Sequence, residues 1–351
     1  MFLVRFLLAM LACAAVGLSI WLLLPRSAPA PARAERLQVA ATIFPLADWL
    51  REVGGADVDV HLLVRGGSNP HHFEPTIKDA TVVTRARALF TVGLGLDEWA
   101  RRLAANSGRG TALAVFETGA WITPRPFGTP AVSVHSDHGT DAAGHRTEGA
   151  EVDLVEQAQA GKFDPHYWLD PLRAAVVVAR MAEELGKLDP PHADGFRQRA
   201  AAYAGKLQAL NSEIEAQARS VRHDARIVTF HDAYGYLLDR LGIGVAAVIQ
   251  VSPGVEPSAR EVSEAIRSMR GIGQRTVFHE PADSGVAAQA VARELGARLE
   301  VLDPLDSEAS SVGKTYLERV RHDVKVLATE AAPLAPPPPA RGEGEQRPET
   351  K

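Results

Sequence analysis

The stretch LQVAATIFPLADWLREVGGADVDVHLLV, residues 37–64, sets the structural pattern of this 351-residue chain. Short apolar runs alternate here with a longer segment that Ile43-Phe44-Pro45 opens as a helix. The pattern continues downstream, and the expected elements are strands at 37–41, 58–64 and 88–92 with helices at 43–53 and 76–87 between them. Strands that alternate with helices pair in parallel, so we expect an α/β lobe.

A second set of alternating elements follows two helices, at 171–188 and about 193–219. In the longer helix the apolar positions step by three and four residues, which marks one buried stripe. At 1.5 Å per residue this helix would run to about 40 Å, long enough to contact two lobes. Beyond it we expect strands near 226–230, 245–250, 276–278 and 298–302, with helices at 233–241, 258–270, 285–295 and 313–329.

The predicted fold class is therefore α/β, with two lobes built on parallel sheets and joined by one long, rigid helix. The segment at about 130–156 is rich in proline, glycine and charge, and we interpret it as a mobile surface insertion. The proline-rich tail has too little apolar surface to pack, so we expect disorder there. The expected parts are a leader at 1–34, a first lobe at 35–190, the connecting helix at 191–220, a second lobe at 221–331 and the tail at 332–351.

Composition excludes several classes of function. Hydrophobic residues make up 46% and charged residues 23%, as in ordinary globular proteins. The net charge of −5 gives no basic surface, so nucleic acid is not an expected partner. The single cysteine, Cys13, lies in the N-terminal apolar segment, so the folded body has neither a disulfide nor a thiolate metal site. Any zinc bound there must be held by nitrogen and oxygen.

The N-terminus has the features of a secretory signal. Residues 6–24 are mostly apolar and follow Arg5, and Ala32-Arg33-Ala34 fits a cleavage site. An uncleaved anchor is the alternative, because the apolar run approaches the roughly 20 residues that span a bilayer. A third reading is lipidation at Cys13. All three place the body outside the cytoplasm, in the periplasm or at the membrane surface.

Four side chains form a candidate metal site. His71 and His166 each directly follow a proline, in NPHHFEP and DPHYWLDP, and proline stiffens the loop around it. His231 and Asp303 each follow an apolar run that predicts a strand. In open α/β sheets ligands bind at the carboxyl ends of strands, where we expect these residues to lie. Three imidazoles and one carboxylate suit a closed four-coordinate site, so metal binding is the leading hypothesis.

The remaining histidines receive other interpretations. His279 ends a predicted strand just before Glu280. These two residues are candidates for contacting the metal ligands without binding the metal themselves. The histidines that we interpret as structural or simply exposed are His61, His192, His223 and His322.

These motifs together resemble the substrate-binding proteins of bacterial zinc and manganese ABC transporters, the metal-binding cluster A-I family. The likeness runs from about residue 37 to residue 329. It rests on the two Pro-His elements, on GLGLDEW at 93–99, on Phe230-His231-Asp232-Ala233-Tyr234 and on Leu302-Asp303-Pro304-Leu305. The resemblance implies two lobes joined by a rigid helix, with the metal buried between them.

The resemblance also implies a ligand set, which falls on His71, His166, His231 and Asp303. Manganese carriers of the family usually have a carboxylate at the third ligand position, whereas this chain has His231, which favours Zn²⁺ over Mn²⁺. Zinc importers tend to carry a histidine- and acid-rich loop before the second ligand, and residues 134–156 occupy that place. The possible auxiliary metal ligands in this loop are His135, His138 and His145.

The expected function is a monomeric receptor that captures Zn²⁺ outside the cytoplasm and delivers it to an ABC import permease. A manganese- or iron-type binding protein of the same fold is one alternative, and a surface adhesin with a structural metal is another. A zinc hydrolase is a third, but catalytic zinc keeps an open water position and the chain has no His-Glu-x-x-His element. We therefore do not expect an enzyme.

Overall fold

The computed structural model describes residues 36–127, 163–250, 255–282 and 285–331. The predicted leader, the insertion with His135, His138 and His145, and the tail lie outside these residues, so the predictions made for them stay predictions. Within the described ranges, no helix combines the length and the apolar character that a membrane span requires.

The first lobe is built on a four-stranded parallel sheet with strand order β2-β1-β3-β4. Its strands are β1 (Leu37–Ala41), β2 (Val58–Leu62), β3 (Ala88–Thr91) and β4 (Ala114–Glu117). Its helices are α2 (Phe44–Gly54), α3 (Ile77–Arg85) and α4 (Glu98–Ala105). Proline sits in the first turn of α2, and a capping box of Thr76 and Asp79 starts α3, as helix N-termini favour.

The second lobe contains two parallel strand pairs, β7 with β8 and β9 with β10. Its strands are β7 (Arg226–Thr229), β8 (Gly244–Val248), β9 (Thr276–His279) and β10 (Arg298–Val301). Its helices are α8 (Gly235–Leu241), α9 (Ala259–Ile272), α10 (Val286–Leu295) and α11 (Tyr316–Glu330). Capping boxes start α9 at Ser258 and α11 at Thr315, so local sequence fixes where these helices begin.

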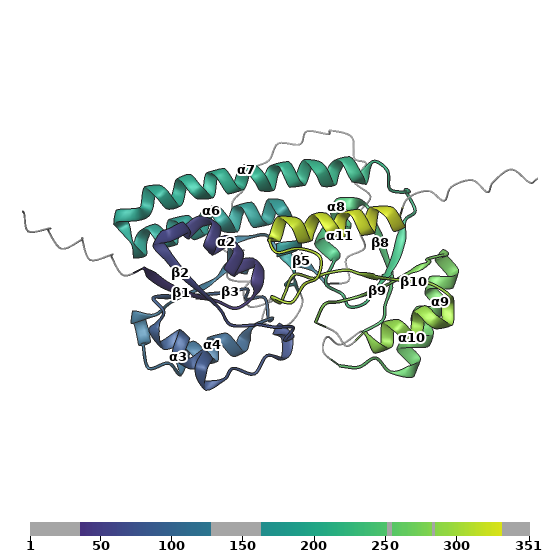
Figure 1. The fold of residues 1–351 in the computed structure, drawn as a ribbon, viewed down its shortest axis with the longest axis horizontal. Coiled ribbons are helices and arrows are strands. Elements are labelled where there is room, and N and C mark those ends of the chain that lie inside the picture. Colours follow the sequence, from purple (N-terminus) through teal and green to yellow (C-terminus); the bar gives the residue numbers. More distant parts are fainter. Residues whose placement is uncertain (1–35, 128–162, 251–254, 283–284, 332–351) are drawn as a thin grey trace, which may run out of the picture. The chain divides into compact units, whose positions relative to one another are not determined.

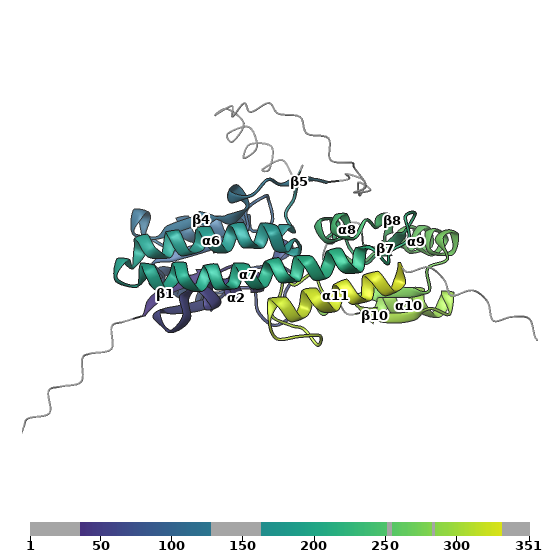
Figure 2. The same cartoon turned by 90° about the horizontal axis from the view of Figure 1, so that it is seen from above.

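Two long consecutive helices pack against each other. They are α6 (Pro171–Leu188) and the 26-residue α7 (Ala193–Ala218). The helix α7 packs against α2 and α6 of the first half and against α8 and α11 of the second, and it runs along both lobes in Figures 1 and 2. The predicted stripe from Phe196 to Ile214 is buried. The predicted α/β class, with parallel sheets and one long connecting helix, is confirmed.

The hydrophobic core follows from this arrangement. One cluster runs from the helix face of the first sheet, through α6 and α7, to α8 and α11, with Trp49 and Trp168 fully buried. A second cluster lies under α3 and α4, and a third packs α9 and α10 against the strands of the second lobe. Since both lobes share the first cluster with α7, the strand ends that face each other between the lobes are held by a common core.

Several segments for which the sequence predicted no helix or strand form short elements. An antiparallel pair joins β5 (Arg125–Pro126) to β6 (Phe163–Asp164). The 3₁₀ helices are η1 (Gly55–Asp57), η2 (Pro70–His72), η3 (Gly110–Ala112), η4 (Thr118–Trp121), η5 (Tyr167–Leu169) and η6 (Pro190–His192). Two of them, η2 and η5, sit at the Pro-His motifs, where the sequence predicted stiff loops.

Candidate metal centre

Three imidazoles from distant parts of the chain meet in one cluster. The ligand atoms offered by His71, His166 and His231 all lie within 4.8 Å of one another. The ring centroids are 5.3–5.9 Å apart. The Nε2 atom of each ring is buried and has no hydrogen-bond partner. Since buried polar atoms are almost always paired, three unpaired nitrogens facing each other fit a cation that would bind all of them.

His71 is held by the short helix η2. The Asn69 side chain accepts a hydrogen bond from the His71 backbone N–H at 2.8 Å, and Pro70 opens the turn. The Trp99 indole N–H donates to the Pro70 carbonyl at 3.0 Å, which ties the loop to α4. His72, the next residue, is exposed, so only one histidine of the pair faces the cluster.

His166 is oriented by a carboxylate from its own motif. Asp164, at the end of β6, accepts hydrogen bonds from His166 Nδ1 at 2.7 Å and from the His166 backbone N–H at 2.9 Å. Asp164 is fully buried, and His166 is only 1% exposed. A carboxylate that holds one ring nitrogen fixes the tautomer and points the other nitrogen at a metal.

His231 has the same kind of support from the second lobe. Glu280, directly after β9, accepts a hydrogen bond from His231 Nδ1 at 2.6 Å. The Tyr234 hydroxyl donates to the Leu302 carbonyl at 2.9 Å and lies 3.1 Å from the same Glu280 oxygen. The neighbouring His279 lines a cavity of about 370 Å³ beside Glu280, outside the three-histidine cluster.

Burial and charge set the protonation of the three rings. Burial, together with the neighbouring imidazoles, lowers the pKa of His71 to about 2 and that of His166 well below its usual value. Burial also acts to lower the pKa of His231, but the charge and hydrogen bond of Glu280 outweigh it and raise this pKa to about 9. Two rings are therefore neutral and ready for metal at pH 7, and the third exchanges its proton for the ion.

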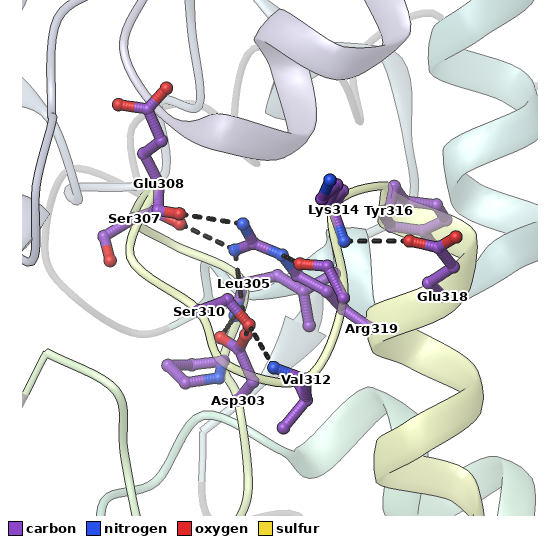
Figure 3. Close-up of polar contacts among 12 residues, drawn as sticks. Asp303, Leu305, Ser307, Glu308, Ser310, Val312, Lys314, Tyr316, Glu318 and Arg319 are labelled. Atoms are coloured by element: carbon purple, nitrogen blue, oxygen red, sulfur yellow. Dashed lines mark hydrogen bonds and ion pairs between the residues drawn. The ribbon is translucent and has the colours of Figure 1, made fainter.

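The fourth predicted ligand, Asp303, is not part of the three-histidine cluster. Its Oδ1 accepts a hydrogen bond from the Leu305 backbone N–H at 2.8 Å, and its Oδ2 accepts one from the Ser310 hydroxyl at 2.6 Å (Figure 3). The Arg319 guanidinium lies 3.7 Å from the same Oδ2. Both oxygens thus hold the loop that follows β10.

Comparison with known proteins decides the family. The model of the family described as "Zinc-uptake complex component A periplasmic" matches residues 39–330, most of the chain. The chain belongs to this family. The resemblance seen in the sequence motifs is thereby confirmed.

Several known proteins are similar to this chain over most of its length. The high-affinity zinc uptake system protein ZnuA of Brucella abortus is 29% identical over 300 residues, covering 82% of this chain and 90% of the relative. The zinc-binding protein AdcA of Streptococcus pyogenes is 26% identical over 295 residues, covering 83% of this chain. The chain matches only 55% of the length of AdcA. Among solved structures, the laminin-binding protein Lmb of Streptococcus agalactiae, a bifunctional protein with adhesin and metal transporting activity, is 28% identical with a TM-score of 0.66. The match covers 85% of this chain and all of Lmb.

One acidic residue of this zinc-uptake family member escaped the sequence analysis. Asp306 is 5% exposed, and burial with the nearby charges of Glu280 and Asp303 raises its pKa to about 7, while His231 acts to lower it. Leu305, directly before Asp306, has a φ of 61°, in the left-handed region that residues other than glycine rarely adopt. The strand-end rule pointed to the first acid after β10. Only a survey of every acid in that loop would have added Asp306.

Proposed function

We propose that this chain is an extracytoplasmic receptor that binds Zn²⁺ between its lobes and delivers it to an ABC import permease. The observation that carries this proposal is the set of three buried, unpartnered Nε2 atoms on His71, His166 and His231. The names of the ZnuA and AdcA relatives support zinc as the cargo. Residues 1–34 would direct the chain out of the cytoplasm, and we propose that it acts as a monomer.

We propose that one carboxylate from the loop after β10 completes the ligand set. Asp303 was the expected ligand, but its two oxygens already accept hydrogen bonds from Leu305 and Ser310. Asp306 is buried close enough to His231 for each to affect the other's pKa. Neither aspartate belongs to the three-histidine cluster in the structure. We favour Asp306 as the fourth ligand, with Asp303 as the residue that shapes its loop.

Asparagine substitutions distinguish the proposed roles of Asp303 and Asp306. Asp306→Asn should lower Zn²⁺ affinity by about 100-fold, because it removes a charged ligand. Asp303→Asn should cost less affinity and more stability, because it weakens the loop that Ser310 and Leu305 close. Zinc affinity is measured by competition with a chromophoric chelator, and stability by thermal unfolding of the metal-free protein. A larger loss of affinity for Asp303→Asn than for Asp306→Asn would return the ligand role to Asp303.

The donor set favours zinc over manganese. Imidazole suits Zn²⁺ in a four-coordinate shell, whereas Mn²⁺ prefers oxygen ligands and higher coordination. Three nitrogens and one carboxylate also close the shell, which leaves no position for the metal-bound water of a hydrolase. We therefore propose a binding protein and not an enzyme.

Metal content after purification tests the identity of the cargo. Protein recovered from the periplasm of cells grown with equal Zn²⁺ and Mn²⁺ should contain close to one zinc per chain and little manganese. The comparison variant is His231→Glu, which should raise the manganese share, because it replaces one nitrogen by oxygen. Near one manganese per chain in the parent protein would favour the manganese-type alternative.

A further inference from the structure

Arg125 lies at the point where two ligand-bearing segments meet. It belongs to β5, which pairs with β6, and its side chain is only 10% exposed. Its Nε donates to Asp239 Oδ2 at 2.7 Å, and its backbone N–H donates to the Tyr236 hydroxyl at 2.8 Å. Both partners lie on α8, the helix that follows His231. Arg125 therefore joins the β5–β6 pair to the second lobe.

The same arginine holds the carboxylate that orients His166. Arg125 Nη1 lies 3.6 Å from Asp164 Oδ2, while Asp164 Oδ1 accepts the hydrogen bond from His166 Nδ1. The Tyr236 hydroxyl donates to the Asp164 backbone carbonyl at 2.9 Å. Asp164 is thus fixed by the ring it supports, by a guanidinium and by a tyrosine of α8. A shift of any of these would turn the His166 ring.

Gly235 shows how closely the two segments pack. It is the first residue of α8 and lies four positions after His231. A Cβ atom on Gly235 would come within 2.8 Å of Asp164 Oδ2 and closer still to the Arg125 guanidinium. The backbone of α8 therefore rests directly against the Arg125–Asp164 pair, with no room for a side chain between them.

We propose that Arg125 is a positioning residue for the metal centre. Its guanidinium contacts Asp164, which orients His166, and Asp239 of α8, the helix that follows His231, and it thereby sets the separation of these two imidazoles. This inference rests on the proposed function, because it assumes that these two rings bind the ion. It goes beyond the ligand set, since Arg125 is not itself a proposed ligand.

Arg240, an arginine of α8, provides a matched control. Arg240 donates to both carboxylate oxygens of Asp170, at 3.2 and 3.1 Å. Asp170 accepts the Leu172 backbone N–H and so caps α6, without orienting a histidine of the cluster. Arg240→Met and Arg125→Met each remove one guanidinium that bridges α8 to a buried aspartate, but only Arg125 lies behind a proposed ligand.

The experiment measures Zn²⁺ affinity by chelator competition and the visible absorption of the Co²⁺-loaded protein, which reports ligand geometry. Arg125→Met should lower Zn²⁺ affinity by about 10-fold, a loss typical of removing a residue that orients a metal ligand. It should also change the Co²⁺ spectrum. Arg125→Lys should restore part of the affinity. Arg240→Met should leave the Zn²⁺ affinity within about twofold of the parent and the Co²⁺ spectrum unchanged, even if it lowers the melting temperature as much as Arg125→Met does. His166→Ala is included as the reference for a lost ligand.

The outcomes separate the inference from the proposed function. Parent-like affinity and spectrum in Arg125→Met, with a large loss in His166→Ala, would overturn the role of Arg125 and leave the metal site intact. Equal losses in Arg125→Met and Arg240→Met would also overturn it, because they would show a general loosening of α8. A parent-like His166→Ala would instead refute the site itself. If Arg125→Met does not fold, Asp239→Asn replaces it: a several-fold loss with an altered spectrum supports the inference, and parent-like values overturn it.

Discussion

Replacement of His166 by alanine should abolish most of the Zn²⁺ affinity, with a loss of at least about 100-fold. Among the described residues the ring supplies one of three clustered nitrogens, and its Nε2 has no hydrogen-bond partner that competes with the ion. Its Nδ1 is already bonded to Asp164, so the ring enters the site in one orientation. Comparable losses are expected for His71→Ala and His231→Ala. Titration calorimetry or chelator competition measures the effect.

Histidines outside the cluster are the matched controls for this loss. The His61 ring is paired with the Gln38 side chain at 2.7 Å, and the His192 ring with Asp189 at 2.7 Å. Alanine at either position should leave Zn²⁺ affinity within a few fold. If His166→Ala bound zinc as tightly as His61→Ala does, the three-histidine site would be wrong.

The features that depend on periodic patterns could be predicted from the sequence. The stripe on α7 is an example: the positions from Phe196 to Ile214 repeat at helical spacing because only that face meets both lobes. His231 was expected at the site for a related reason. Parallel strands end at a common edge, so a histidine directly after a strand faces the same crevice as others placed likewise.

The features that depend on the path of an irregular loop could not be predicted. Asp303 satisfied the strand-end rule, yet its oxygens bind the loop's own Leu305 N–H and Ser310 hydroxyl. The same loop is held by Arg319, which donates to the carbonyls of Ser307, Glu308 and Gly313 from the following helix. No spacing in the sequence reports that an arginine from α11 closes this loop, so the position of Asp306 follows only from the folded structure.

The carboxylates that hydrogen-bond to the imidazoles include one contact set by the local sequence and one set by the fold. Asp164 lies inside the DPH motif, only two residues from His166, so the local turn brings its oxygen back to the ring. Glu280 lies 49 residues from His231, and the two meet because β7 and β9 end on the same side of the second lobe. The sequence predicted a supporting role for Glu280, whereas it predicted no role for Asp164 beyond its place in the motif.

The affinity for Zn²⁺ should fall about tenfold for each unit that the pH drops from 9 to 7. Imidazole binds metal only when neutral, and Glu280 raises the pKa of His231 to about 9 in the metal-free protein. The pKa values of His71 and His166 lie far below 7, so these rings hold no proton that zinc must displace. Below about pH 7 the slope should steepen, because burial raises the pKa of Asp306 to about 7 and a second proton then competes. Three unperturbed imidazoles, with pKa values of about 6.5, would instead give an affinity that is flat above pH 7.

The sign of the effect on stability is opposite to the effect on affinity. A raised pKa means that the His231–Glu280 pair stabilises the metal-free fold fully below about pH 6.5, and that this contribution is lost as the pH rises through 9. Metal takes over from the proton as partner of the ring at high pH. Glu280→Gln separates this explanation from a general pH effect. Without the charge and hydrogen bond of Glu280, burial should outweigh the smaller effects of Asp306 and Asp232 on the pKa of His231, and the dependence of affinity on pH between 9 and 7 should disappear. Chelator competition at half-unit steps of pH measures both proteins, and a parent protein whose affinity stays flat from pH 9 to 7 would show that Glu280 does not hold a proton on His231.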